Sequence, residues 1–156
     1  MTHTIVNPAG LHDPVPFGYG HTAAVPAGSD LVVVAGQYGS GPDGAVVAPA
    51  FAAQVRQAFA NLGVALAAHG LDLRHVVQLR TYVVGLDADK LATVGRIVGE
   101  LAAAGGTGGT GGGGGEGDGD GAALPPPQTL VGVAALATPE ILFEVEAVAA
   151  RPVAEP

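Results

Sequence analysis

Two short stretches near the end of the chain carry the polar residues best placed for chemistry. Three prolines at 125–127 keep the backbone extended and withhold three N–H donors, so Gln128 is the first residue there that can pair fully in a sheet. In the stretch 141–149, apolar residues alternate with Glu144 and Glu146, which places both carboxylates on one face of a strand. An amide offers donors and an acceptor, and a carboxylate can position water or move a proton. We therefore expect any site to lie along these two strands.

Other candidate groups carry weaker signals. Gly36 lies at the end of an apolar run and would let another molecule approach the main chain, although a bulge or turn explains a glycine there equally well. His3, His12 and His21 show no metal-ligand spacing, and a surface or hydrogen-bonded role is the simpler interpretation. The chain has no cysteine, and hence no thiol nucleophile or zinc–thiolate site. The sequence predicts neither a metal nor a cofactor.

Composition restricts the partners and the location that we expect. With 14 acidic and 6 basic residues the formal charge is −8, and the cations are scattered, so binding to a phosphate backbone is disfavoured. The N-terminus lacks the pattern of a signal peptide, and no apolar run approaches the ~20 residues of a membrane span. We expect a cytoplasmic protein with no nucleic-acid or membrane partner. Its many short side chains bury little area each, so neighbouring subunits could supply part of the core.

Several stretches have the pattern of strands. The run 31–37 is apolar and β-branched almost throughout, which is typical of a strand buried on both faces. Turn residues at 26–30 precede it and predict a hairpin with a strand at 22–25. Further strands are expected at 4–6 and 76–84, with a short one at 45–47.

Two amphipathic helices alternate with these strands. Apolar residues recur every three or four positions from 50 to 69, with polar residues such as Gln54 and Asn61 on the other faces. Asp87 can cap a second helix over 88–104. The order of hairpin, helix, strand, helix and two strands places two helices against one face of a mixed sheet, an α+β layer.

A glycine-rich tract at 105–121 interrupts this pattern. Twelve of its 17 residues are glycine, and no Lys-Ser/Thr pair follows, so it does not match a phosphate-binding loop. We interpret it as a low-complexity insertion that acts as a solvated linker within one domain spanning 1–156.

Five segments, taken together and in order, carry a specific resemblance. They are Leu-Val-Val-Val-Ala-Gly-Gln at 31–37, Gln-Val-Arg-Gln-Ala-Phe-Ala-Asn-Leu at 54–62, Leu-Arg-Thr-Tyr-Val-Val-Gly-Leu at 79–86, Pro-Pro-Gln-Thr-Leu-Val-Gly-Val at 126–133 and Phe-Glu-Val-Glu-Ala-Val-Ala at 143–149. In these segments the chain resembles the RidA (YjgF) family of reactive-intermediate deaminases. The resemblance implies a chorismate-mutase-like fold of order β-β-β-α-β-α-β-β, forming a homotrimer around a barrel of three sheets with ligand clefts between subunits. It also implies a hydrolase that converts an enamine or imine to a carbonyl compound and ammonia.

The resemblance also implies roles for single residues. Tyr19 matches the family's cleft tyrosine, and Gly36 matches the glycine whose backbone N–H meets the ligand. Glu144 matches the acid thought to position the attacking water. Two positions depart from the family: Ala35 replaces a serine, and Gly95 replaces an asparagine.

The largest departure is at Gln128, where the family has an arginine that binds the substrate carboxylate. A guanidinium gives a planar fork with a fixed charge, and an amide gives neither. Charged hydrogen bonds contribute roughly 1.5–3 kcal/mol each, or about 10- to 150-fold in affinity for an anionic 2-imino acid. Gln128 could still bind a neutral amide, ester or ketone.

Three hypotheses remain open at this point. The first is an enzyme in which Glu144 acts on an imine, enamine or related carbonyl compound that lacks the usual carboxylate. The second is a ligand-binding or structural trimer without catalysis. The third is a conventional 2-imino-acid deaminase in which Arg80 or Arg96 from another subunit replaces the missing arginine. The ribonuclease label sometimes attached to the family is disfavoured by the acidic charge.

Overall fold

The computed structural model describes residues 3–105 and 124–151. The predicted glycine-rich insertion therefore lies outside the described residues, except for Gly105 at the end of a helix. In chain order the elements are β1 (Thr4–Val6), η1 (Val15–Phe17), β2 (Thr22–Ala24), β3 (Asp30–Tyr38), α1 (Phe51–Ala67), η2 (Leu73–His75), β4 (Val76–Val84), α2 (Ala88–Gly105), β5 (Gln128–Val133) and β6 (Phe143–Arg151).

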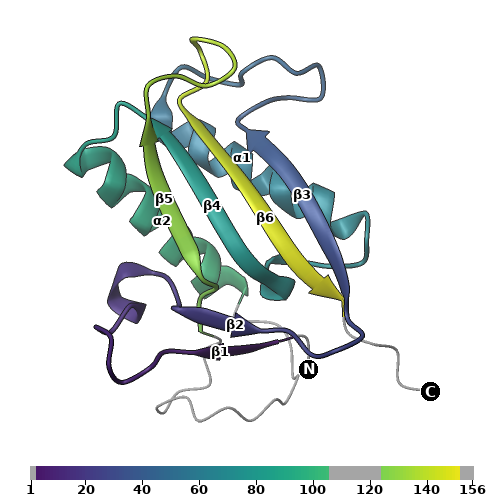
Figure 1. Ribbon diagram of the computed structural model, residues 1–156. Coiled ribbons are helices and arrows are strands. Elements are labelled where there is room, and N and C mark those ends of the chain that lie inside the picture. The colour runs from purple at the N-terminus through teal and green to yellow at the C-terminus, as the bar shows by residue number, and fades with distance from the viewer. Residues whose placement is uncertain (1–2, 106–123, 152–156) are drawn as a thin grey trace.

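A mixed four-stranded sheet forms the centre of the molecule. Its strand order is β3-β6-β4-β5, in which β4 and β5 are parallel and the other neighbours are antiparallel. Both helices cover the same face of this sheet, while β1 and β2 form a separate two-stranded sheet at one end (Figure 1). This arrangement confirms the predicted α+β fold with two helices on one face. No helix in the described ranges is both long and apolar enough to cross a membrane.

The predicted hairpin between 22–25 and 31–37 is wrong. The strand β2 pairs with β1, and β3 pairs instead with β6, which has the same length of nine residues. The turn at 26–30 does form, since Ser29 N donates to Pro26 O, but it redirects the chain between two sheets. The stretch 45–47 is not a strand, and its residue Val46 forms an isolated bridge with Ser40.

Within a single chain, the prediction that β3 is buried on both faces is also wrong. Val32 and Val34 are buried in the core beneath α1, but Leu31 is 59% exposed and Val33 77% exposed. An all-apolar run conceals the alternation of a strand, so the sequence could not show that only one of its faces is covered by helices. The sheet therefore presents an uncovered face, which we call the open face (Figure 1).

Two polar residues of α1 point inward, contrary to the prediction. Gln54 is fully buried, and its amide nitrogen donates to Ala48 O at 3.0 Å and to Glu140 O at 2.9 Å. Its amide oxygen accepts from Leu142 N at 2.9 Å. Asn61 also turns inward and donates to the main chain of β3. Gln54 thus fixes the start of β6, the strand that carries Glu144, against the start of α1.

We expect Gln54→Leu to lower the free energy of unfolding by about 2–3 kcal/mol. The apolar side chain would leave two carbonyls and one N–H without the partner that Gln54 supplies, and each such loss costs up to about 1–3 kcal/mol, less where water replaces the partner. Urea unfolding of the variant checks this. Gln57→Leu is the matched control on the same helix, because it breaks only a side-chain contact with Asn61. Equal stabilities for the two variants would contradict the structural role of Gln54.

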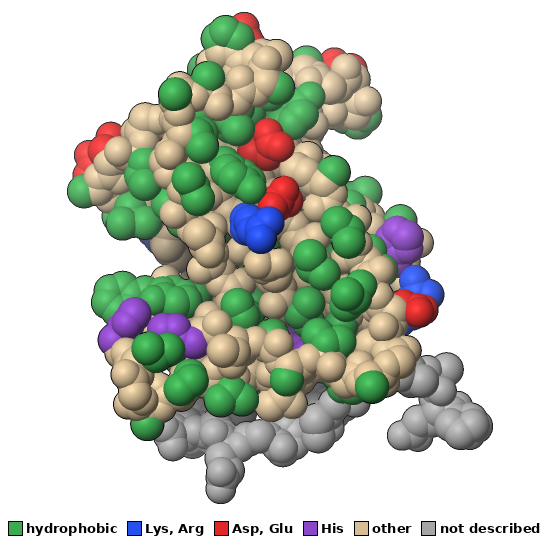
Figure 2. Space-filling view, in the orientation of Figure 1, with side chains coloured by type: hydrophobic (Ala, Val, Ile, Leu, Met, Phe, Trp, Pro, Cys, Tyr) green, Lys and Arg blue, Asp and Glu red, His purple; other side chains and the backbone are tan. Residues whose placement is uncertain are grey.

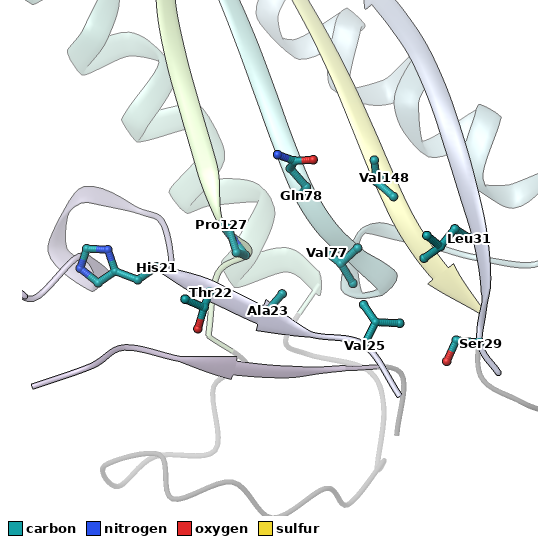
Figure 3. A pocket seen from close by; sticks show the side chains of 10 residues that line it. All are labelled: His21, Thr22, Ala23, Val25, Ser29, Leu31, Val77, Gln78, Pro127 and Val148. Carbon is teal, nitrogen blue, oxygen red and sulfur yellow. The ribbon is translucent and has the colours of Figure 1, made fainter. Parts of the chain in front are cut away.

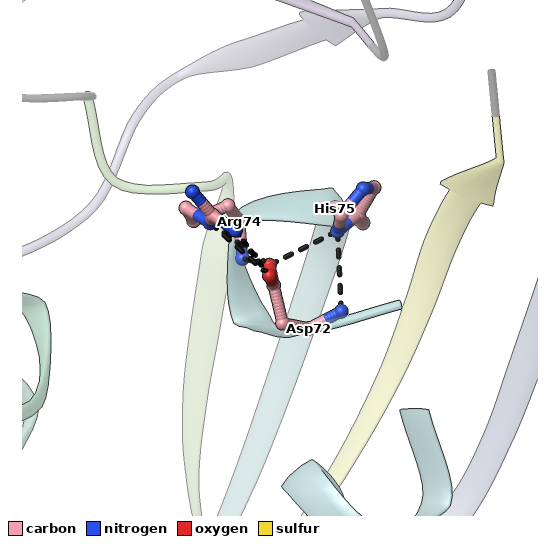
Figure 4. Close-up of polar contacts among 3 residues, drawn as sticks. All are labelled: Asp72, Arg74 and His75. Atoms are coloured by element: carbon pink, nitrogen blue, oxygen red, sulfur yellow. Dashed lines mark hydrogen bonds and ion pairs between the residues drawn. The ribbon is translucent and has the colours of Figure 1, made fainter. Parts of the chain in front are cut away.

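The turn before β4 is stabilised by an acidic cap (Figure 4). The Asp72 carboxylate accepts from Arg74 N at 2.9 Å and lies 2.6 Å from the Arg74 guanidinium. His75 Nδ1 lies 3.0 Å from the same carboxylate. The hydrogen bond from the Arg74 side chain is the main cause that lowers the pKa of Asp72 from 3.8 to about 2.

This shift predicts a small loss of stability in acid. Because the pKa of Asp72 is lower in the folded state, its contribution is present above pH ~4 and disappears as the pH falls towards 2. The side chain is 45% exposed, so solvent screening limits the effect to about 1 kcal/mol or less. Urea unfolding should show that Asp72→Asn is less stable than the wild type at pH 6 and equally stable near pH 2. A difference that does not change with pH would contradict this assignment.

Candidate functional site

The proline segment before β5 brings the N-terminal loop to the sheet. Pro127 O accepts from Leu79 N at 2.9 Å, and Pro126 O accepts from Gly20 N at 3.1 Å. Gly20 has no room for a side chain, because a Cβ there would lie 2.7 Å from Pro125 O. Proline has no backbone N–H to donate, so these prolines join the structure through the hydrogen bonds that their carbonyl oxygens accept. The adjacent Tyr19 is thereby placed beside the start of β5. The bounds of β5 confirm Gln128 as the first residue of that strand.

Tyr19 and Gln128 line one hollow of about 300 Å³. The Gln128 amide nitrogen donates to Thr81 Oγ1 over 3.4 Å, a long contact to a side chain that is fully buried. One donor of the amide is thus engaged, and a second donor and the carbonyl oxygen can serve a ligand. Gln78 and Thr129 add further polar groups to the lining. We call this hollow the glutamine pocket.

A second hollow of about 490 Å³ adjoins the glutamine pocket. It lies between β2 and the end of the open face, and the two share His21, Gln78 and Pro127 (Figure 3). Its other walls are largely apolar, with Leu31 and Val148 facing it from β3 and β6. The two hollows therefore offer a polar end and an apolar end to one small molecule.

Glu144 occupies a different part of the sheet, above Gly36. The pairing of β3 with β6 shifts register between Val34 and Gln37, so Gly36 lies in a β-bulge. A Cβ at Gly36 would overlap the Glu144 carboxylate. The bulge interpretation of this glycine is confirmed, and the group that comes close to the main chain is this chain's own acid. Within residues 3–105 and 124–151, Glu144 has no hydrogen-bond or ion-pair partner.

The neighbouring acid on the open face is fully engaged. Glu146 accepts from Arg80 and from the Tyr82 hydroxyl, each over 3.1 Å. Burial raises the pKa of Tyr82, and the hydrogen bond to Glu146 adds to that rise. Figure 2 shows acidic and basic side chains together among hydrophobic ones in the middle of this face. Of the two acids, Glu144 is the one available to a ligand.

Gln128 and Glu144 are not brought together within one chain. Gln128 pairs with Leu79 and Glu144 with Tyr82, so they are separated by three residues along β4 and by two strand spacings. This separation is about 14 Å. Their side chains also face opposite sides of the sheet, since Leu79 is buried under the helices and Tyr82 lies on the open face. A small ligand therefore cannot contact both side chains within one chain.

The remaining predicted positions fall elsewhere. Ala35 lies exposed in the bulge next to Gly36. Gly95 lies on the exposed side of α2, separated from Glu144 by the sheet, with no heavy atom within 4 Å of a Cβ placed there. Arg96 is on the same helix and pairs with Glu100 at 2.8 Å. This placement gives Gly95 and Arg96 no contact with either part of the candidate site.

Sequence reasoning missed one group. His12 Nε2 lies 2.6 Å from the Tyr19 hydroxyl, and His21 Nε2 donates to His12 O at 2.8 Å. The interpretation of His12 and His21 as hydrogen-bonded histidines is confirmed, but their convergence on Tyr19 was not predicted. The sequence feature that could have indicated this convergence is the clustering of Phe17, Tyr19 and His21 within five positions. The loop folds back so that all three rings contact the ring of His12.

Comparison with protein-family models identifies the family of this chain. Residues 17–151 match the family model described as endoribonuclease L-PSP. The chain belongs to this family, the Rid or YjgF family. The family resemblance seen in its five segments is therefore confirmed. A search among curated proteins found no match.

Solved structures of Rid family proteins share the fold. A Rid protein of unknown function from Yersinia pestis, YyfB, has 31% identity and a TM-score of 0.79, over 96% of this chain and 98% of that one. Rv2704 from Mycobacterium tuberculosis has 31% identity and a TM-score of 0.53, over 94% and 98%. The YjgF protein of E. coli has 26% identity and a TM-score of 0.60, over 82% and 85%. These likenesses support the chorismate-mutase-like Rid fold for this chain.

Proposed function

We propose that this Rid family protein hydrolyses a small imine or enamine that carries no carboxylate, at clefts between copies of the chain. The observation that carries the proposal is the unpartnered Glu144 carboxylate, which lies over Gly36 on the uncovered face of the sheet. A carboxylate with no internal partner is available to accept a proton from water. Belonging to the Rid family supports a role in small-molecule binding or imine deamination.

The reaction assigns one step to each group. A water oxygen attacks the carbon of the C=N bond while Glu144 accepts a proton from that water. Glu144 passes this proton to the nitrogen, which gives the carbinolamine. Glu144 then accepts the hydroxyl proton of the carbinolamine and gives it to the leaving amine, while the C–N bond breaks with its electron pair going to nitrogen and the C=O bond forms. The products are a carbonyl compound and ammonia or an amine, so one water is consumed and no oxidant is needed. Gln128 orients the neutral substrate through its amide.

The substrate class follows from the charges around the site. Gln128 supplies no positive charge for a carboxylate. Arg80 lies on the open face but is bound to Glu146, and Arg96 is bound to Glu100 on the far side of α2. Neither arginine is free to replace the family's residue, which favours a neutral substrate over a conventional 2-imino acid.

The two parts of the site meet if the β5 edge of one copy, which carries Gln128, packs against the open face of the next copy. Leu31 and Val33 on β3 and Val131 on β5 are large apolar residues that stay exposed there. Burial of such residues drives association. A homotrimer with closed symmetry would place the glutamine pocket of one copy beside Glu144 of the next.

We expect native mass spectrometry to find an assembly of three chains, each of 15.2 kDa. A neutral small molecule retained in that assembly would identify the ligand class directly. A stable monomer at micromolar concentration would contradict both the trimer and the intersubunit site. A trimer that accelerates no imine hydrolysis would leave the non-catalytic binding protein as the better description.

A further inference from the structure

The loop before β2 builds a hydrogen-bonded pair beside the glutamine pocket. Asp13 accepts from Val15 N at 3.0 Å, and Phe17 N donates to Pro14 O at 2.9 Å, so the loop has its own internal bonds. These bonds return the chain so that Tyr19 reaches His12, seven residues earlier. The His12 ring contacts those of Phe17 and Tyr19 edge to face.

The chemistry of the two groups, and not the length of the contact, indicates which one donates in the His12–Tyr19 hydrogen bond. The two atoms lie 2.6 Å apart, and this geometry fits either tautomer of His12. A phenol is the stronger donor of the two, and a neutral imidazole offers one nitrogen lone pair. The single phenolic proton of Tyr19 is therefore directed at His12 Nε2.

We propose that His12 is a positioning residue that makes Tyr19 a hydrogen-bond acceptor towards the glutamine pocket. Because the Tyr19 hydroxyl donates its hydrogen bond to His12, the Tyr19 oxygen presents only lone pairs to a ligand. Such an oxygen selects a group that carries an N–H, whereas Gln128 can donate to the ligand's carbonyl. The inference rests on the glutamine pocket being the ligand site of the proposed function, and it assigns the nitrogen end of the substrate to Tyr19.

The charged and titratable groups near this pair do not compete for the proton. The Asp13 carboxylate accepts from Val15 N. His21 uses its Nε2 to donate to the backbone of His12, so it holds the loop without reaching the phenol oxygen. Gln78 and Thr129, which line the pocket, are neutral.

Two neutral probes of the same shape, one with an N–H and one without, test this proposal through the dependence of their relative affinity on His12. N-methylpropionamide and methyl propionate have the same number of heavy atoms, and only the first can donate to Tyr19. We expect the wild type to bind the amide about tenfold more tightly than the ester in NMR titrations. In His12→Phe, which keeps an aromatic ring but no acceptor, the preference should fall to about twofold or less, and His12→Gln should restore part of it.

A spectroscopic measurement on the free protein separates positioning from packing. With ring-labelled tyrosine, the Cζ resonance of Tyr19, identified by its loss in Tyr19→Phe, should shift in His12→Phe and return towards the wild-type value in His12→Gln. His69→Phe, at an exposed histidine beyond α1, is the matched control and should change nothing. An unchanged Tyr19 resonance in His12→Phe, an unchanged probe preference, or no binding of either probe to the wild type would overturn the proposal.

The same variants distinguish this inference from the proposed reaction. If the amide preference depends on His12 but the wild type hydrolyses no imine, the role of His12 stands and the hydrolytic function fails. If imines are hydrolysed and His12→Phe changes neither the resonance nor the probe preference, the reverse holds.

Discussion

Replacing Glu144 with glutamine is expected to slow imine hydrolysis by about 10²- to 10⁴-fold, the usual contribution of a general base. The amide has the shape of the acid but cannot accept a proton from water. The fold should be unaffected, because Glu144 has no internal partner among the described residues. The measurement is the decay of a neutral imine generated in situ, followed at saturating and limiting concentrations.

Glu146→Gln is the matched control for that experiment. It lies on the same strand and the same face, but its carboxylate is engaged by Arg80 and Tyr82. We expect its effect on the rate to be less than about tenfold, since it acts on the site only through its neighbours. Equal losses in both variants would show that the charge of the face matters rather than Glu144. An unchanged rate in Glu144→Gln would remove the catalytic assignment.

The second large effect is expected at Gln128. Gln128→Arg should accelerate hydrolysis of an anionic 2-imino acid by about 10- to 150-fold, because it adds charged hydrogen bonds to the carboxylate. The start of β5 can accept the longer side chain, since Gln128 is only partly buried and lines an open hollow. We expect the gain to stay below the upper value, because Ala35 lacks a hydroxyl and preorganised donors act as a set.

Gln78→Arg supplies the control for a general effect of positive charge. Gln78 lines the same pocket, but it lies on β4 instead of at the start of β5. The double variant Gln128→Arg/Glu144→Ala should lose the gain. If the wild type already hydrolyses the 2-imino acid as fast as Gln128→Arg does, Gln128 does not select the substrate, and the neutral-substrate proposal loses its main support.

The sequence predicted those elements whose pattern is local. The strand 76–84 agrees with β4 residue for residue, because polar and apolar side chains alternate along it. The second helix begins after Asp87 as expected, since Asp87 Oδ1 accepts from Lys90 N at 2.8 Å. Gln128 as the start of β5 followed from the donors that proline lacks.

What depends on distant partners could not be predicted. An apolar run such as β3 has the same sequence pattern whether one or both of its faces are covered. The pairing of β3 with β6 joins residues that are more than a hundred positions apart. From the sequence alone Gln54 is expected on the surface of the helix, because the backbone groups to which it hydrogen-bonds lie in distant segments. Likewise, no local pattern reveals that Gln128 and Glu144 face opposite sides of one sheet.

Each proposed site takes Gln128 from one copy of the chain and Glu144 from another, so two inactive variants should complement each other when they are mixed. Gln128→Leu and Glu144→Gln chains would each lack one part of every site. After co-expression, random assembly into trimers should restore about a quarter of the intact sites, because each site needs one wild-type part from each of two neighbours. We predict imine hydrolysis at about a quarter of the wild-type rate in the mixture. A rate no higher than the mean of the two separate variants would contradict a site shared between copies of the chain.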